Sequence, residues 1–115
     1  MPLSVEAAIT VPGMHFWPTA PDRREYLRSP HRHLFHVTAE VKVDYADRAV
    51  EFHDLQDAIH QIVMQRNLLG SAENPVAASC ETMASLIEGY LRDRHYDPIH
   101  VAVSEDGENT GHWRA

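Results

Sequence analysis

Apolar and polar residues alternate along three stretches of the chain. In residues 4–11 and 33–44 the apolar side chains stand mainly at odd positions, and residues 99–104 repeat the pattern in a shorter form. Successive side chains of a β-strand point to opposite faces, so this alternation predicts three strands, each with one buried and one solvated face. A further short edge strand is expected after Asp106-Gly107, ending at Trp113.

The period changes to that of an amphipathic α-helix in two other stretches. A helix is predicted at about residues 53–66, and a second one begins near Ser79, whose hydroxyl suits the N-cap position. Residues 69–75, between the two helices, have the composition of a turn. The apolar stripes consist of Leu55, Ala58, Ile59, Ile62 and Val63 in the first helix and of Met83, Leu86, Ile87, Tyr90 and Leu91 in the second.

Two segments interrupt this regular pattern. Pro12-Gly13 is expected to end the first strand, and residues 12–30 to form a long loop with at most a distorted continuation of that strand. After a turn at residues 44–47, the short segment 49–52 is expected to complete a strand pair. Strands and helices thus come in blocks, which predicts an α+β fold: an antiparallel sheet with two helices packed on one face, in one domain spanning residues 1–115. The edges of such a sheet favour self-association.

Composition excludes several classes of function. The 115 residues include 17 acidic and 10 basic side chains, which gives a net charge of −7 with the nine histidines neutral. This charge repels phosphate backbones and no basic stripe offsets it, so nucleic acid is not expected as a partner. No stretch approaches the roughly 18 apolar residues of a membrane span. The N-terminus lacks a basic leader followed by an apolar run, so a cytoplasmic location without a membrane partner is expected.

The histidines offer the clearest chemical signal. Cys80 is the only cysteine, which excludes an internal disulfide and a multi-cysteine zinc site. His31 and His33 are separated by one residue beside a predicted strand, so their side chains point to the same side, roughly 7 Å apart where they leave the backbone. If the first strand continues past Pro12-Gly13 without a bulge, His15 lies in phase with its buried face. Three imidazoles could then form an open Zn²⁺ site; the alternative is an isolated His-x-His with no metal role.

Glu105 follows the last long strand in phase with its buried side chains. A carboxylate there could pair with the N–H and amino edge of a guanidine-like heterocycle, or it could simply belong to the acidic turn that follows. Cys80 at a helix start could have a lowered thiol pKa, although a structural role beside Ser79 is favoured. Solvated roles are expected for the other six histidines, which are His36, His53, His60, His95, His100 and His112.

The order of these residues resembles the 6-pyruvoyl-tetrahydropterin synthase and 6-carboxy-tetrahydropterin synthase family along nearly the whole chain. The resemblance implies a T-fold: an antiparallel four-stranded sheet with two helices on one face, assembled into a barrel as a homotrimer or hexamer. It also implies zinc ligands at His15, His31 and His33 and a pterin-anchoring carboxylate at Glu105. The segments that carry it are His15, His31-Arg32-His33, Glu51-Phe52-His53-Asp54-Leu55, Ser79-Cys80-Glu81-Thr82 and Val103-Ser104-Glu105.

The chain departs from the family at the residues that transfer protons. The family's catalytic cysteine falls on Leu27 in this sequence. The family's Asp-His pair falls within residues 63–68, which contain neither residue type. Glu25, on the long loop, is therefore the candidate catalytic base, ahead of Asp54 and His53.

Three functions are consistent with this pattern. The first is a zinc-dependent lyase of the synthase type that acts on a dihydropterin triphosphate-like substrate, slowed about 10²- to 10⁴-fold if the usual base is missing. The second is a non-catalytic T-fold protein that keeps the zinc site and binds a pterin or purine-like small molecule. The third is an assembly subunit whose histidines serve only packing or solvent contact.

Overall fold

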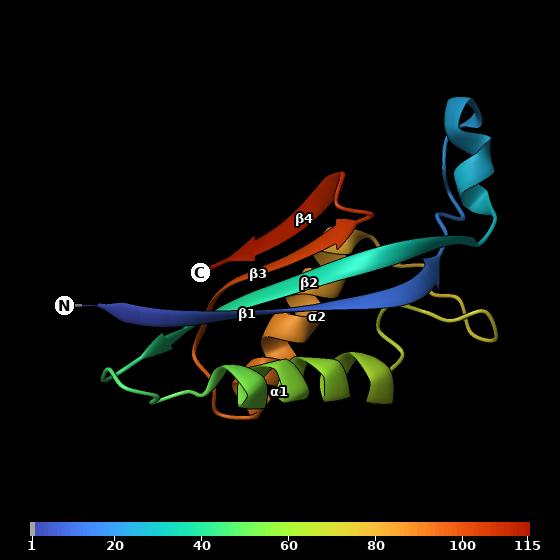
Figure 1. Cartoon of the computed structure of the whole chain (residues 1–115). Coiled ribbons are helices and arrows are strands. Elements are labelled where there is room, and N and C mark those ends of the chain that lie inside the picture. The colour runs from blue at the N-terminus through green and yellow to red at the C-terminus, as the bar shows by residue number, and fades with distance from the viewer. Residues whose placement is uncertain (1) are drawn as a thin grey trace.

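A four-stranded antiparallel sheet forms the centre of the computed structural model, which describes residues 2–115. Helices α1 (Phe52–Gln65) and α2 (Cys80–Asp93) lie on the same side of this sheet, as Figure 1 shows. The α+β architecture predicted from the sequence is therefore confirmed, including the short last strand. The strands lie in the order β1 (Leu3–His15), β2 (His31–Val43), β3 (Pro98–Glu105) and β4 (Asn109–Arg114).

The core lies between the sheet and the two helices. Helix α1 packs against β1, and α2 packs against β3 and β4. Each helix begins at a side-chain cap: Glu51 accepts a hydrogen bond from the N–H of Asp54 at 2.8 Å, and Ser79 accepts one from Thr82 at 3.2 Å. The odd positions of the strands face the helices, as the alternation predicts. The fully buried strand residues are Phe35, Val37, Ala39, Val41, Val101 and Val103.

Pro12-Gly13 does not end the first strand, so that prediction was wrong. β1 continues to His15, and its pairing with β2 keeps a single register as far as His15 opposite His31. β1 is an edge strand, and the N–H of Met14 points away from β2 to the carbonyl oxygen of Leu69 at 3.0 Å. The nitrogen of Pro12, two residues earlier, therefore also points away from β2. Because it faces the outer side, the absence of an N–H at Pro12 removes no hydrogen bond between β1 and β2.

The segment 67–78 runs along the outer edge of β1 at this end of the sheet. The carbonyl of Met14 accepts a hydrogen bond from the N–H of Val76 at 3.1 Å, and the N–H of Phe16 donates to the carbonyl of Val76 at 3.1 Å. Gly70 has a φ of 76°, and a side chain there would collide with the carbonyl of Met14. The segment therefore closes the edge of β1 beside its last residues.

Three other boundaries differ from the prediction. The long loop contains a 3-10 helix, η1 (Asp22–Arg28), which projects beyond the end of the sheet between β1 and β2 (Figure 1). β2 begins at His31 instead of residue 33, because the pairing with β1 extends two residues further. The segment 49–52 is not a strand: residues 49 and 50 form a bend, and Phe52 is already the first residue of α1. Among residues 2–115, no helix is long and apolar enough to span a membrane.

Candidate metal centre

Four side chains from three strands meet where β1 and β3 end and β2 begins. His15 lies directly opposite His31 in the β1–β2 pairing, and Glu105 lies opposite Phe35, two residues after His33. All of these residues occupy odd positions, so their side chains project from the face of the sheet that the helices cover. The register between β1 and β2 has no bulge, which is why the phase predicted for His15 holds.

The three imidazoles form a tight cluster. Their ring centroids are 4.6 Å apart between His15 and His31, 5.1 Å between His15 and His33, and 5.0 Å between His31 and His33. One donor atom from each histidine and one from Glu105 lie within 4.8 Å of one another. The structure therefore brings together the three histidines named from the sequence and adds Glu105, in a group that could bind a metal ion.

Each of the three histidines is held through Nδ1 by an acceptor outside the cluster. His15 donates to the carbonyl of Ala78 at 2.8 Å, and His31 donates to the carbonyl of Ser29 at 2.9 Å. His33 donates to a carboxylate oxygen of Asp106 at 2.6 Å. Carbonyl and carboxylate oxygens only accept, so Nδ1 carries the proton in each ring. This arrangement leaves Nε2 as the donor atom for a metal, the usual geometry of metal-bound histidine.

Glu105 faces two of these Nε2 atoms. Its Oε2 lies 3.0 Å from Nε2 of His15 and 3.0 Å from Nε2 of His33. Nε2 of His15 is buried, and its contact with Glu105 is short enough for an ion pair but does not have the direction of a hydrogen bond. A divalent cation among these atoms would satisfy both the buried nitrogen lone pair and the carboxylate. Three imidazoles and one carboxylate are also a donor set that Zn²⁺ accepts.

Gly13 and Asp106 were not identified as site residues from the sequence, although both shape the cluster. The ring of Phe35 lies edge-on to His15 and His33, with centroids 5.4 and 5.7 Å away. A Cβ atom on Gly13 would approach that ring to 2.8 Å, so the glycine leaves the space that Phe35 fills. Asp106-Gly107 carried only a turn signal, and nothing in the sequence indicates which side chain an acidic turn residue contacts.

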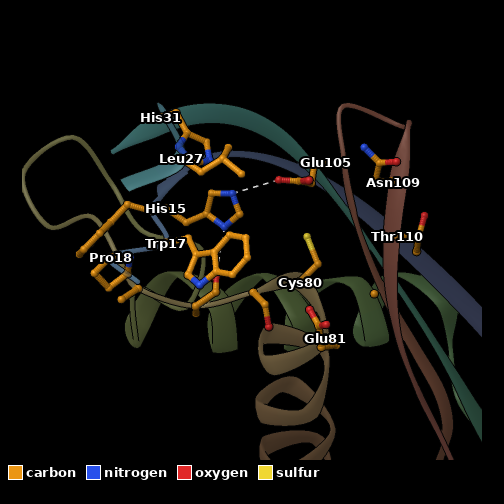
Figure 2. A pocket seen from close by; sticks show the side chains of 15 residues that line it. His15, Trp17, Pro18, Leu27, His31, Cys80, Glu81, Glu105, Asn109 and Thr110 are labelled. Atoms are coloured by element: carbon orange, nitrogen blue, oxygen red, sulfur yellow. Dashed lines mark hydrogen bonds and ion pairs between the residues drawn. The ribbon is translucent and has the colours of Figure 1, made fainter. Parts of the chain in front are cut away.

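A cavity of about 450 Å³ opens beside the cluster and is shown in Figure 2. His15, His31 and Glu105 form part of its wall. The rest of the wall comes from the loop after β1, the end of η1, the start of α2 and β4, and includes Trp17, Leu27, Cys80, Glu81, Asn109 and Thr110. A cavity of this size with a mostly apolar wall and a few polar groups is typical of a small-molecule site.

Cys80 lies in the cavity wall but is not an activated thiol. Burial, together with the negative charges of Glu105 and Glu81, raises the pKa of Cys80 to about 12. The thiol is therefore protonated at neutral pH, which agrees with the structural role and not with a lowered pKa at the helix start.

Alkylation of Cys80 by iodoacetamide at pH 8 is expected to be about 1,000-fold slower in the folded protein than in urea. The thiol pKa is about 12 in the folded protein instead of the ordinary 9.0, so the thiolate fraction at pH 8 is about a thousandth of that in the unfolded chain. The rate should increase as the pH rises toward 12, since the thiolate fraction grows as the pH approaches the pKa. Mass spectrometry of timed samples measures this ratio. Equal labelling of folded and unfolded protein at pH 8 would contradict it.

The candidate bases lie away from this cavity. Glu25 is exposed on η1 and does not form part of the cavity wall, whereas Leu27 of the same helix does. His53 and Asp54 lie in the first turn of α1, where His53 contacts Glu51 at 2.8 Å. The structure therefore brings the three histidines and Glu105 together but does not bring Glu25 to them.

The fold is shared with solved proteins of very different sequence. The chain superimposes on an uncharacterized protein from Wolinella succinogenes with a TM-score of 0.74 and 11% identity, over 99% of this chain and 98% of the other. It superimposes on 6-pyruvoyl tetrahydropterin synthase from Caenorhabditis elegans with a TM-score of 0.66 and 10% identity, over 100% and 96%. No protein-family model and no curated protein sequence matches the chain. The chain therefore has the fold of a tetrahydropterin synthase, as its resemblance implied.

Proposed function

We propose that this chain is a zinc-dependent, pterin-handling protein, and in the first place a lyase of the tetrahydropterin synthase type. One observation carries the proposal: three histidines, each held through Nδ1, converge with Glu105 at the wall of a cavity large enough for a bicyclic ring. The shared fold of 6-pyruvoyl tetrahydropterin synthase supports the same class of ligand.

Each residue of the site has a part in this proposal. His15, His31 and His33 would hold the ion through Nε2. Zinc bound there would supply Lewis-acid polarisation of an oxygen function on the ligand's side chain. Glu105 contacts two of the histidines and forms part of the cavity wall, where its carboxylate would accept hydrogen bonds from the amino and ring N–H groups of a pterin.

Non-catalytic binding is the second candidate, and the composition of the cavity wall favours it. Leu27 stands in the wall and supplies no proton-transfer group at the position that matches the family's cysteine. Cys80 is protonated, and Glu25 is exposed outside the cavity. Loss of a positioned base typically slows such a reaction about 10²- to 10⁴-fold. Ligand binding does not need this base, so the chain would still bind the ligand while its turnover is lost.

The open edges of the sheet support a homo-oligomer, which we propose to be a trimer or hexamer. β1 and β4 are both edge strands, each paired with one neighbour within the chain. Unpaired edge groups are usually covered, and pairing between copies is one way to cover them.

The proposal is tested with protein purified without a histidine tag. Metal analysis is expected to find about one zinc per chain, since the three histidines supply the protein ligands of one ion and leave its fourth position for the bound ligand. His33→Ala should lose most of this zinc, whereas His60→Ala, at an exposed position on α1, should keep it. The zinc-loaded protein is then incubated with dihydroneopterin triphosphate, and release of triphosphate or acetaldehyde is measured.

The outcomes separate the alternatives. Release of either product supports the lyase, and saturable binding of the pterin without product supports the non-catalytic protein. Sub-stoichiometric zinc that His33→Ala leaves unchanged would reject both and favour histidines that serve only packing.

A further inference from the structure

His33 lies between the carboxylates of two consecutive residues. Its Nε2 is 3.0 Å from Oε2 of Glu105, and its Nδ1 is 2.6 Å from Oδ2 of Asp106. Nδ1 of His15 and of His31 contacts a main-chain carbonyl instead. Among the three clustered histidines, His33 is therefore the one whose outer nitrogen is bound by a charged side chain.

Asp106 is itself fixed by the residue next to His33. Its Oδ1 accepts a hydrogen bond from the N–H of Leu34 at 2.8 Å, and its own N–H donates to the carbonyl of Leu34 at 2.8 Å. The turn makes this possible, because Asp106 and Gly107 have left-handed φ values of 54° and 72°. Both carboxylate oxygens of Asp106 are thus occupied, one by the backbone of β2 and one by His33.

We propose that Asp106 is a positioning residue for the metal centre: it fixes the ring of His33 with Nδ1 protonated and Nε2 directed at the ion. The inference rests on the metal site of the proposed function and adds to it a residue that contacts no ligand. A carboxylate on the outer nitrogen of a metal-bound histidine fixes the tautomer, prevents rotation of the ring and makes the nitrogen a stronger donor. A structural role at the turn would account for the bond from Leu34 to Oδ1 but not for the contact of Oδ2 with His33.

The size of the effect follows from the exposure of the contact. Loss of such an outer partner typically weakens metal binding about 10- to 100-fold. The side chain of Asp106 is 43% exposed, so water can partly replace the carboxylate. We therefore expect a loss of about tenfold in zinc affinity, at the lower end of that range.

Two substitutions remove the interaction without straining the turn. Asp106→Gly deletes the carboxylate and tolerates a positive φ. Asp106→Asn keeps the shape but has an NH2 group in place of one of the two oxygens that accept from Leu34 and His33, so one of these two contacts is lost. Glu108→Gln is the matched control, since Glu108 lies in the same turn, is exposed, and makes no side-chain hydrogen bond or ion pair within residues 2–115.

Zinc affinity is measured by competition with a chromophoric chelator, using Zn²⁺ alone as the probe. Both Asp106 variants should bind zinc about tenfold more weakly than the unchanged protein, and Glu108→Gln should stay within about twofold. In the metal-free protein, nitrogen-15 NMR of the imidazoles should show His33 with Nδ1 protonated. In Asp106→Gly the proton should move from Nδ1 toward Nε2 of His33, which still faces the carboxylate of Glu105, with His31 unchanged.

The inference and the proposed function fail in different ways. If the unchanged protein binds zinc and the Asp106 variants bind it equally well with His33 in the same tautomer, Asp106 has no positioning role and the metal site stands. If the unchanged protein binds no zinc, both proposals are overturned. A variant that loses affinity while His33 keeps its tautomer would also overturn the inference, because Asp106 would then not act by fixing the His33 ring.

Discussion

Zinc affinity is expected to fall by more than about 100-fold when His15 is replaced by alanine, because a direct ligand should cost more than the roughly 10- to 100-fold typical of an outer partner. His15 is the most buried member of the cluster, with 8% of its surface exposed. Its Nε2 is buried without a directional hydrogen bond, so water cannot readily take its place. The variant would also leave the carbonyl of Ala78 without its side-chain donor.

This affinity is measured with the same chelator competition, beside a thermal melt that reports folding. His60→Ala is the matched control, because His60 is exposed on α1 and lies outside the cluster. Cobalt substitution gives an independent measure, since loss of a nitrogen ligand changes the visible spectrum of Co²⁺. Equal zinc affinity in folded His15→Ala and in His60→Ala would show that His15 is not a ligand.

A Gly13→Ala variant is expected to lose about 3 kcal/mol of unfolding free energy or more, at or above the upper end of the roughly 1–3 kcal/mol that an overfilled core usually costs. The added methyl group would lie 2.8 Å from two carbons of the Phe35 ring and closer still to the carbonyl oxygen of Leu69. Phe35 is fully buried, and the Leu69 carbonyl is held by the N–H of Met14. Neither group can move without breaking other contacts.

Urea unfolding compares this variant with Gly89→Ala. Gly89 lies within α2 with open space where a Cβ would stand, so alanine there should raise the unfolding free energy by about 0.5–1 kcal/mol. Zinc affinity should also fall in Gly13→Ala, because the ring of Phe35 packs against His15 and His33. If Gly13→Ala is as stable as Gly89→Ala, a methyl group at residue 13 does not collide with Phe35 and Leu69, and the prediction is wrong.

The fold was predictable because burial in this chain follows a simple period. Residues 35–41 of β2 alternate strictly between fully buried odd positions and partly exposed even ones, and this contrast is readable from side-chain types alone. The same parity placed His15 with His31 and His33, provided that β1 kept its register. Whether β1 keeps its register through Pro12-Gly13 could not be judged from the sequence. A proline fits into a strand only when its nitrogen lies on an unpaired edge, and the sequence does not indicate which strands lie at the edge of the sheet.

The remaining parts of the site depend on contacts between segments distant in sequence. Asp106 reaches His33 across 73 residues, and the carbonyl of Ala78 reaches His15 across 63. No local pattern records such pairs. Glu105 was predicted as a contact for a heterocycle, and its position against Nε2 of His15 and His33 depends on the relative placement of β1, β2 and β3.

The covered end of β1 sets a limit on how the sheet can be extended. Met14 and Phe16 already use their outward main-chain groups in hydrogen bonds to the segment 67–78, and Pro12 has no N–H to offer. The side chain of Gln56 takes the outward carbonyl of Ala8 at 2.9 Å. An added strand could therefore pair only with the main chain of residues 3–11, about 30 Å at roughly 3.3 Å per residue, and within that stretch it would compete with Gln56 for the carbonyl of Ala8. A strand added to this edge would therefore end before the histidine cluster.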